Sequence, residues 1–207
     1  MPVTEYLIRN AELYPDEVAL VELNPDEKDT RRTTWKEFDL IQPSANMPYR
    51  REITWSVFNE KANRFANMLI SRGDKVAILM YNCLEWLPIY FGVLKTGAIA
   101  VPFNFRYDSD EIYYCAELAQ VDVIVFGFAF IGRIEVNAER LLRGRLLIYV
   151  GDNCPSFAES YHELVADCSS KEPDVKITED DYGAIYFSSG TTGFPKAILH
   201  KHQSLTQ

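Results

Sequence analysis

Short apolar runs alternate with amphipathic stretches between residues 75 and 150, and this alternation constrains the fold more than any other feature. The apolar runs predict strands at residues 76–80, 98–103, 122–126 and 146–150. The stretches between them predict helices at residues 84–95, 110–119 and 132–142. Alternation of this kind favours an α/β fold, with a mostly parallel layered sheet and helices on both faces.

The flanking segments complete this outline. The spacing of apolar residues predicts a helix over Val3–Tyr14, and Val18–Leu23 is a predicted strand. A second amphipathic helix carries Phe58, Ala62, Phe65 and Leu69 on one face and is expected to end at Gly73. Further predictions are a helical stretch at 157–167, a polar link at 169–176, and a hairpin of the strands 184–187 and 197–199.

Local signals fix two helix starts. Pro88 should fall in or near the first turn of its helix, where a missing N–H does no harm, or else kink the helix. Asp108 or Ser109 should cap the helix that follows.

A short repeat interrupts the N-terminal part. Residues 31–38 and 50–58 are similar strand-to-helix entries, and the first is cut short by Pro43 and Pro48. Residues 35–49 are therefore interpreted as an insertion, although coincidence also explains so short a repeat.

Length and charge narrow the class of protein. A chain of 207 residues with 47% apolar residues is long enough for one domain with a real core. The net charge of −9, from 21 basic and 30 acidic residues, disfavours a general nucleic-acid binder. No acidic residue follows Asp181, whereas Lys196 and Lys201 do, so the C-terminal end is locally cationic.

The spacing of the cysteines and the N-terminal residues indicate the cellular compartment in which the protein is expected. The four cysteines show no C-x-x-C spacing, which predicts free thiols without a disulfide framework or a zinc site. The first residues lack a signal-peptide pattern, and the longest apolar run, Val123–Gly132, is too short for a membrane span. A cytoplasmic protein is expected.

The segment SSGTTGFPK, from Ser188 to Lys196, carries the most specific chemical signal. Glycines let backbone N–H groups approach an anion, hydroxyls donate further bonds, and a lysine supplies a charge. The P-loop NTPase pattern fails because Pro195 precedes the lysine and Ala197 follows it, and the dinucleotide pattern G-x-G-x-x-G fails as well. A polar turn with a solvated lysine is the bland alternative.

The longer string YFSSGTTGFPKAILHKH resembles the phosphate-binding signature of the acyl-activating, adenylate-forming enzymes, which include the acyl-CoA synthetases, the luciferases and the adenylation domains of peptide synthetases. One position departs from the family pattern, since Ala197 stands where a glycine is usual. Weaker matches lie upstream at Gly73–Ala77, Asn82–Trp86, Tyr90–Pro102, and Asn104 with Arg106.

The resemblance implies the chemistry of AMP-forming acid–thiol ligases. A carboxylate attacks the α-phosphate of ATP, pyrophosphate leaves, and the acyl-adenylate passes its acyl group to a thiol, usually that of coenzyme A. The resemblance also implies ATP, Mg²⁺ and coenzyme A as ligands, and a loop that wraps the β- and γ-phosphates. Its cofactor-binding residues would be Ser188, Ser189, Gly190, Thr191, Thr192, Gly193 and Lys196.

The histidines offer a weaker alternative. His200 and His202 could form an imidazole pair for a metal, but two histidines at a strand end are more often structural. His202 matches a position of the family and is interpreted as packing or hydrogen-bonding beside the loop.

The remaining family motifs, for adenine, the magnesium-binding acid, ribose, the hinge and the catalytic lysine, are not found up to Gln207. Residues 1–207 are therefore expected to be the N-terminal portion of an AMP-binding large domain, with no catalytic residue or metal site of their own. Such a fragment is predicted to be inactive alone and prone to self-association. A non-catalytic nucleotide-binding, phosphate-binding or interaction module is the other class that stays open.

Overall fold

The computed structural model describes residues 1–23, 50–70, 75–188 and 195–206. The predicted insertion 35–49, the first copy of the repeat and the helix stop at Gly73 lie outside the described residues.

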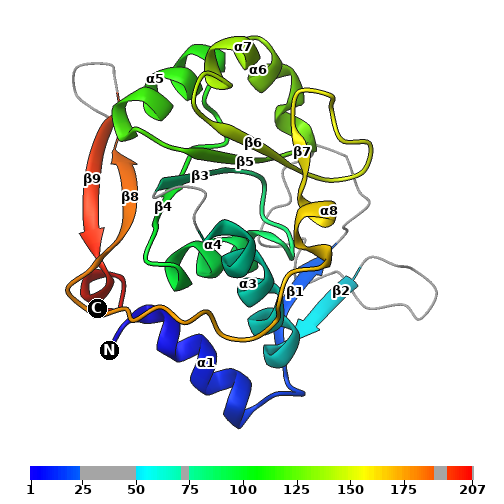
Figure 1. The fold of residues 1–207 in the computed structure, drawn as a ribbon, viewed down its shortest axis with the longest axis vertical. Helices are drawn as coiled ribbons and strands as arrows, with labels where there is room; N and C mark the ends of the chain where they lie inside the picture. Colours follow the sequence, from blue (N-terminus) through cyan, green and yellow to red (C-terminus); the bar gives the residue numbers. More distant parts are fainter. Residues whose placement is uncertain (24–49, 71–74, 189–194, 207) are drawn as a thin grey trace, which may run out of the picture.

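A seven-stranded sheet forms the centre of the molecule, in the order β7-β6-β5-β3-β4-β8-β9 (Figure 1). All neighbouring strands in this sheet run parallel except β8 and β9, which form an antiparallel pair. The predicted α/β fold with a mostly parallel sheet is confirmed. The strands are β3 (Lys75–Leu79), β4 (Ile99–Pro102), β5 (Val123–Gly127), β6 (Leu146–Val150), β7 (Glu159–Ser160), β8 (Tyr182–Ser188) and β9 (Lys196–Lys201).

Helices cover both faces of this sheet, as the alternation of the sequence predicted (Figure 1). One face is covered by α5 (Ser109–Ala119), η1 (Phe128–Phe130), α6 (Ile131–Glu135) and α7 (Ala138–Leu141). The other face is covered by α3 (Trp55–Leu69), α4 (Trp86–Lys95) and α8 (Tyr161–Ala166).

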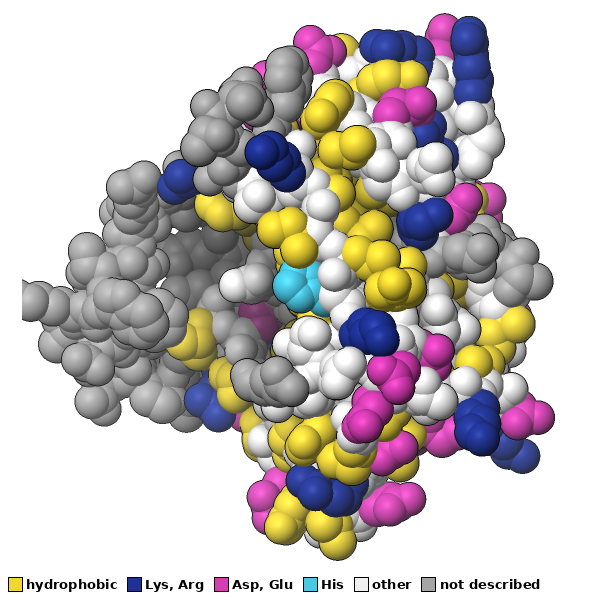
Figure 2. Space-filling view, turned by 90° about the vertical axis from the view of Figure 1, so that its left-hand side faces the viewer, with side chains coloured by type: hydrophobic (Ala, Val, Ile, Leu, Met, Phe, Trp, Pro, Cys, Tyr) yellow, Lys and Arg dark blue, Asp and Glu magenta, His cyan; other side chains and the backbone are white. Residues whose placement is uncertain are grey.

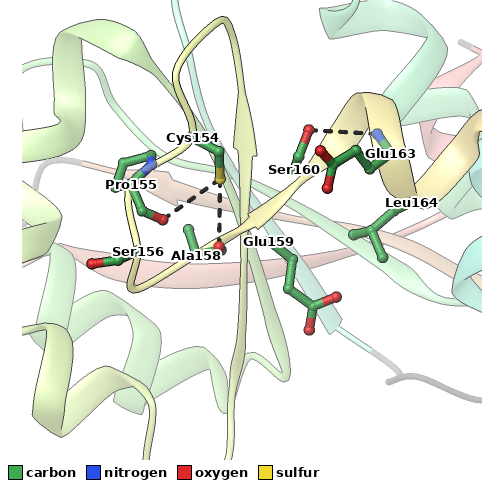
Figure 3. A pocket seen from close by; sticks show the side chains of 8 residues that line it. All are labelled: Cys154, Pro155, Ser156, Ala158, Glu159, Ser160, Glu163 and Leu164. Carbon is green, nitrogen blue, oxygen red and sulfur yellow. Dashed lines mark hydrogen bonds between the residues drawn. The ribbon is translucent and has the colours of Figure 1, made fainter.

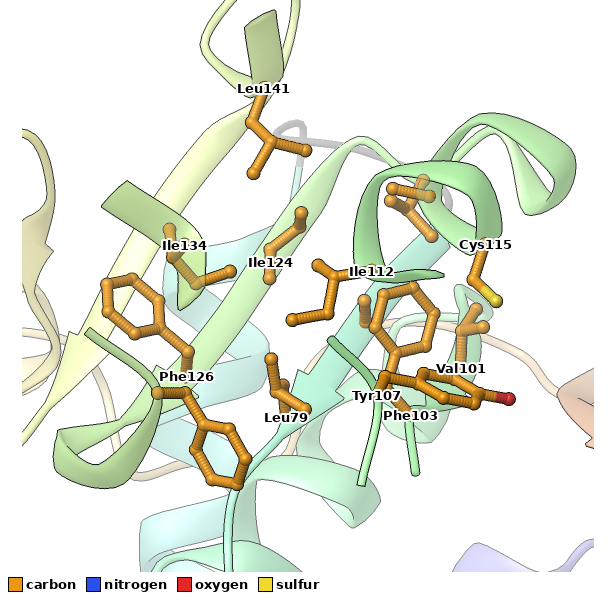
Figure 4. Close-up of a cluster of buried hydrophobic side chains, with 14 of the residues drawn as sticks. Leu79, Val101, Phe103, Tyr107, Ile112, Cys115, Ile124, Phe126, Ile134 and Leu141 are labelled. Atoms are coloured by element: carbon orange, nitrogen blue, oxygen red, sulfur yellow. The ribbon is translucent and has the colours of Figure 1, made fainter. Parts of the chain in front are cut away.

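The core follows from the period of two along each strand. In β3, Ala77 and Leu79 point into the cluster beneath α5, whereas Val76 and Ile78 belong to the cluster beneath α3 and α4. Figure 4 shows the first cluster, with side chains from β3, β4 and β5 meeting those of α5 and α6. Strands buried on both faces need apolar residues at every position, which explains their continuous apolar runs.

The N-terminal elements add a smaller layer. Helix α1 (Val3–Leu13) lies against α3, and the antiparallel pair β1 (Val18–Leu23) and β2 (Arg50–Thr54) leads the chain into α3. Leu7, Phe58 and Ala62 form the buried cluster between these elements. The structure thus confirms the predicted N-terminal helix, the predicted strand Val18–Leu23 and the amphipathic helix α3 with its apolar face.

The local start signals act as expected. Asp108 caps α5, and its Oδ1 accepts bonds from the backbone N–H groups of Asp110 and Glu111 at 3.0 and 2.9 Å. Pro88 is the third residue of α4 and lies in its first turn.

Two helix predictions were wrong in extent. The stretch 132–142 is divided into α6 and α7, because Asn137 adopts non-helical angles between them and donates through Nδ2 to the carbonyl of Ser109 at 2.9 Å. The stretch 157–167 contains β7 before any helix, and Glu159 and Ser160 of β7 pair with Ile148 and Tyr149 of β6. The Ser160 hydroxyl then caps α8, so that helix begins only at Tyr161.

Within the described residues, no helix is both long and apolar enough to cross a membrane.

Candidate functional site

The predicted phosphate loop lies between β8 and β9, the two strands of an antiparallel hairpin. Ser188 at the end of β8 is directly opposite Lys196 at the start of β9. Of the predicted phosphate-binding residues, the structure describes Ser188 and Lys196 and brings them together at the base of the loop. The other five predicted members, Ser189, Gly190, Thr191, Thr192 and Gly193, lie outside the described residues.

The loop begins at the carboxyl edge of the parallel sheet. Strand β8 runs parallel to β4, with Ala184 beside Ala100, so Ser188 lies at the same edge as the carboxyl ends of β3, β4 and β5. In open α/β sheets, ligands bind in the crevice outside this edge. The position of the loop therefore agrees with a ligand-binding role.

Aromatic packing anchors β8 just before the loop. The ring of Phe187 packs against Phe103 and Tyr107, with centroid distances of 5.8 and 6.4 Å. On the other face of β8, the Tyr186 hydroxyl lies 2.9 Å from the Tyr90 hydroxyl. Burial, with the hydrogen bond to Tyr186, raises the pKa of Tyr90 far above its ordinary value, which keeps the Tyr90 phenol neutral. The base of the loop is held from both faces.

The electrostatic surroundings of the hairpin favour an anion. Lys196 is exposed, and no acidic side chain within the described part of the chain forms an ion pair with it. The nearest acids in the sequence are engaged elsewhere: Asp180 pairs with Lys201 at 3.0 Å, and Asp181 accepts bonds from Thr178. The hydrogen bonds from Thr178 lower the pKa of Asp181. Within the described residues, the charge of Lys196 is therefore not neutralised by an ion pair.

The Asn104 and Arg106 pair forms the turn after β4, at the same edge. The Asn104 Oδ1 accepts a bond from the Arg106 backbone N–H at 3.0 Å, which closes a local turn. Arg133 donates to the carbonyls of Phe105 and Tyr107 at 2.7 and 3.0 Å and fixes the same segment. The described contacts of Asn104 are therefore structural.

His202 does not lie beside the loop, as the sequence analysis proposed. It follows Lys201, which pairs with Tyr182 at the start of β8, whereas the loop lies beyond Ser188 at the other end of the hairpin. His202 lies six residue steps beyond Lys196, which is about 20 Å along an extended strand. Because β9 runs antiparallel to β8, it leads away from the loop, so His202 lies at the opposite end of the hairpin from the loop. The motif alone does not show this direction.

The packing role of His202 is confirmed. Its ring is fully buried beside Gly183 and Leu205, and neither ring nitrogen has a hydrogen-bond partner among the described residues. Burial lowers the pKa of the imidazole, so the neutral form is favoured. His200 instead packs edge-on against Tyr186 at 5.2 Å. Within the described residues, no group of three metal-ligating side chains brings the two histidines together with a third ligand.

A pocket at the opposite edge of the sheet offers no competing site. It lies between β7 and α8, and Figure 3 shows its lining, which includes Cys154, Glu159 and Glu163. The Cys154 thiol lies 3.4 Å from the carbonyl of Ala158, and burial raises its pKa, which disfavours the nucleophilic thiolate. All four cysteines are free thiols in the structure.

Sequence reasoning missed a buried lysine. Lys95, at the end of α4, is 2% exposed, and its Nζ donates to Asn59 and Asn63 at 2.7 Å each and to both oxygens of Glu172 at 2.8 and 2.6 Å. Burial lowers the pKa of Lys95, although the Glu172 carboxylate opposes this shift. Burial raises the pKa of Glu172, but the bonds from Lys95, Asn59 and Asn63 outweigh burial and hold it below its ordinary value.

This ion pair fixes the crossover 168–181, which carries the chain from α8 to β8 (Figure 1). Side chains of α3 hold the same crossover by its backbone. Arg64 donates to the carbonyl of Cys168 at 2.6 Å, Asn63 to that of Ser170 at 3.0 Å, and Asn67 to that of Lys171 at 2.8 Å. The sequence offered one sign of a buried, paired lysine, which is that Lys95 is the only charged residue of an otherwise apolar helix.

Comparison with known families gives a match over almost the whole chain. The family model described as AMP-binding enzyme matches residues 7–207. The long-chain-fatty-acid–CoA ligase FadD13 of Mycobacterium tuberculosis is 31% identical over 170 residues, which is 80% of this chain and 32% of that protein. The 3-hydroxybenzoate–CoA/4-hydroxybenzoate–CoA ligase of Thauera aromatica is 29% identical over 172 residues, covering 80% of this chain and 33% of that protein.

Solved structures agree in fold. The anthranilate CoA ligase AuaEII, in complex with anthranoyl-AMP, superposes on 98% of this chain with a TM-score of 0.79 and 23% identity, over 35% of its own length. The N-terminal domain of FACL13 from Mycobacterium tuberculosis superposes on 99% with a TM-score of 0.74 and 25% identity, over 45% of its own length. The chain thus spans about a third of the length of the curated relatives it matches.

Proposed function

Because this chain belongs to the family of AMP-binding enzymes, we propose that it forms the N-terminal part of an ATP-dependent acid–thiol ligase. The observation that carries the proposal is the SSGTTGFPK segment, whose two described ends, Ser188 and Lys196, meet at the carboxyl edge of the sheet. The relatives include ligases named for long-chain fatty acids and for hydroxybenzoates, which supports a carboxylic acid as the substrate class.

The proposed reaction has two steps. A carboxylate oxygen attacks the α-phosphorus of ATP, the bond from that phosphorus to the bridging oxygen breaks, and pyrophosphate leaves with that oxygen. The thiol sulfur of coenzyme A then attacks the acyl carbon, loses its proton, and displaces AMP. Coenzyme A is proposed as the acceptor because the named relatives are CoA ligases.

The loop would act on the pyrophosphate end of ATP. Backbone N–H groups and hydroxyls from Ser188 to Gly193 would bind the β- and γ-phosphate oxygens, and Lys196 would offset the charge that develops as pyrophosphate leaves. The exposed Lys196, without an acidic partner in the described part of the chain, supports this role. We assign the Mg²⁺ ion that accompanies ATP no ligand here, because the described residues hold no group of three metal ligands.

Residues 1–207 alone are proposed to be inactive. Phosphoryl transfer requires nucleotide, metal and carboxylate to be held together within a narrow tolerance. A site that binds one end of ATP stabilises the ground state and the transition state about equally, so it supports weak binding and little rate.

The test is a pyrophosphate-exchange assay on residues 1–207 with ATP, Mg²⁺ and acetate, medium-chain, long-chain and aromatic acids. We expect no exchange above background, and turnover with any acid would overturn the assignment of an inactive part. The matching assay on a ligase that contains this chain should show acid-dependent exchange and, with coenzyme A, a thioester. Absence of exchange in that ligase would refute the proposed function itself.

A further inference from the structure

The loop end of the hairpin, residues 185–188 of β8 and 195–199 of β9, extends beyond the pairing of β8 with the rest of the sheet. Strand β8 pairs with β4 at one position, Ala184 beside Ala100, and then continues to Ser188 with β9 as its described neighbour. These two strands are the outermost of the sheet on the side that Figure 2 faces. Within the described residues, the loop end is therefore held to the interior mainly by side chains on its two faces.

Side chains of neighbouring residues in β8 make these contacts, one on each face of the hairpin. Phe187 packs against Phe103 and Tyr107 on the face that α5 covers. Tyr186 faces α4, and its hydroxyl lies 2.9 Å from the Tyr90 hydroxyl. Among the described residues, no other side-chain hydrogen bond reaches the loop end from outside the hairpin. Packed rings can slide past one another, whereas a hydrogen bond fixes both a distance and a direction.

Tyr90 is a rigid anchor for this bond. It is 8% exposed and stacks on Trp86 with a centroid distance of 5.4 Å and an interplanar angle of 15°. Helix α4 is itself fixed against α3, because a Cβ at Gly92 would lie 2.8 Å from the carbonyl oxygen of Ala62. So close a contact leaves α4 no room to move toward α3. The Tyr90 hydroxyl is therefore a fixed point that sets the position of β8.

Tyr186 lies two residues before the predicted phosphate loop, on the face that also carries Ser188. Successive side chains of a strand alternate between its faces, so Tyr186 and Ser188 point to the same side, about 7 Å apart along the strand. Ser188 is opposite Lys196, and residues opposite one another share a face. The hydrogen-bonded tyrosine therefore lies next to the pair of residues that begins and ends the loop.

We propose that Tyr90 is a positioning residue for the predicted phosphate loop and that it acts through Tyr186. Its hydrogen bond holds the loop end of β8 at one height above α4, so that Ser188 and Lys196 meet the β- and γ-phosphates of ATP in the geometry that release of pyrophosphate requires. Neither tyrosine is assigned a contact with the nucleotide. This inference rests on the proposed function.

Such a role makes one half of the proposed reaction depend on this bond and not the other. Pyrophosphate leaves in the first step, so the loop has no β- or γ-phosphate to bind when the thiol attacks the acyl-adenylate. A displaced loop should therefore slow adenylate formation and spare thioester formation from a supplied acyl-adenylate. A general loss of stability would instead lower both steps together.

The test uses a ligase that contains this chain and measures the two steps separately. Pyrophosphate exchange at varied ATP concentration measures the first step, and thioester formation from synthetic acyl-adenylate and coenzyme A measures the second. Tyr90→Phe, which removes the hydroxyl and keeps the ring, should lower kcat/KM for ATP in the exchange by about tenfold. It should leave thioester formation unchanged. Equal losses in both steps, or no loss in the exchange, would overturn the proposal.

The matched control is Tyr149→Phe, in β6 toward the other edge of the sheet. Tyr149 is fully buried, and its hydroxyl donates to the carbonyl of Asp152 at 3.0 Å, so the same substitution removes one hydrogen bond there. Both variants should lose stability in thermal unfolding, but only Tyr90→Phe should slow the exchange. A control that slows the exchange as much would reduce the effect of Tyr90 to stability and overturn the proposal.

A second variant removes the same bond from its other partner. Tyr186→Phe should slow the exchange by the same factor as Tyr90→Phe, and the double variant should lose no more than either one, because all three lack the same hydrogen bond. Losses that multiply in the double variant would refute a joint role of the two hydroxyls. A wild-type ligase without exchange would refute the proposed function and this inference with it, whereas an active wild type with an unaffected Tyr90→Phe variant would overturn this inference alone.

Discussion

The two edges of the central sheet are closed in different ways. The edge at β7 is two residues long, consists of Glu159 and Ser160, and passes at once into α8. The edge at β9 is six residues long, is apolar on both faces at Ile198 and Leu199, and starts at the predicted phosphate loop. Short, charged edge strands discourage pairing with other chains, whereas long apolar ones invite it.

The strands beside the two edges also differ in how tightly they pack. The interior near β7 is filled by aromatic rings, since Phe126 stacks on Phe157 and packs at a tilt against Tyr149. The hairpin of β8 and β9 is supported by Phe187 and Tyr186 on the β8 side, while β9 itself packs little. The predicted phosphate loop is therefore attached to a strand that is mostly exposed.

The largest expected effect is the loss of the lysine at the loop. In a ligase that contains this chain, Lys196→Ala should slow adenylate formation by about 100- to 1,000-fold, because one partner of the transition-state charge is removed. Pyrophosphate release is the measurement, and Lys201→Ala at the other end of β9 is the control that should change it little. An unchanged rate in Lys196→Ala would remove this residue from the mechanism.

The next prediction compares the loss of stability when an isoleucine is replaced by alanine near each edge of the sheet. Ile148→Ala, in β6 next to β7, should lower the free energy of unfolding by about 2–5 kcal/mol, because Ile148 is fully buried. Ile198→Ala in β9 should cost about 0.5 kcal/mol or less. Urea denaturation compares the two variants below the concentration at which the chain associates. Equal costs would mean that β9 is as well packed as β6.

A smaller loss is expected in the crossover that joins the two edges. Glu172→Ala should destabilise the chain by about 3 kcal/mol, because it leaves the buried Lys95 ammonium without its carboxylate. Lys95→Met, which removes the charge and keeps the length, should cost less. Thermal unfolding of both variants decides the order, and a larger loss for Lys95→Met would contradict this account of the ion pair.

The smallest effect is a pH dependence from His202, at the far end of β9. Burial holds its folded-state pKa below the ordinary value of about 6.5, so the unfolded chain binds the proton first as the pH falls. Stability should therefore decline below about pH 6.5, until the folded-state pKa is reached. Urea denaturation between neutral and mildly acidic pH should show this decline in the wild type and a weaker one in His202→Leu. Equal slopes would assign the decline to other groups.

The sequence predicted what depends on local pattern. The parallel strands around Val76 and Val123, the cap at Asp108 and the hairpin around the loop all carry periodic or turn signals within a few residues. The β7 strand was missed because two residues hold no period. The position of His202 depends on the register between β8 and β9, which the motif does not contain. The pairing of Lys95 with Glu172 joins residues 77 apart in the sequence, so no short stretch of sequence predicts it.

The first part of the crossover 168–181 is held by hydrogen bonds from side chains of α3 to its backbone carbonyls. Asn63, Arg64 and Asn67 donate to main-chain carbonyls between Ala166 and Lys171, and every residue type provides such a carbonyl. The side chains at residues 169–171 should therefore tolerate substitution better than the polar face of α3, whereas Thr178 and Asp181 further along the crossover are bonded to one another. In a library of single substitutions, tolerance should therefore be high along the irregular segment and low on the regular helix beneath it, the reverse of the usual relation between loops and helices.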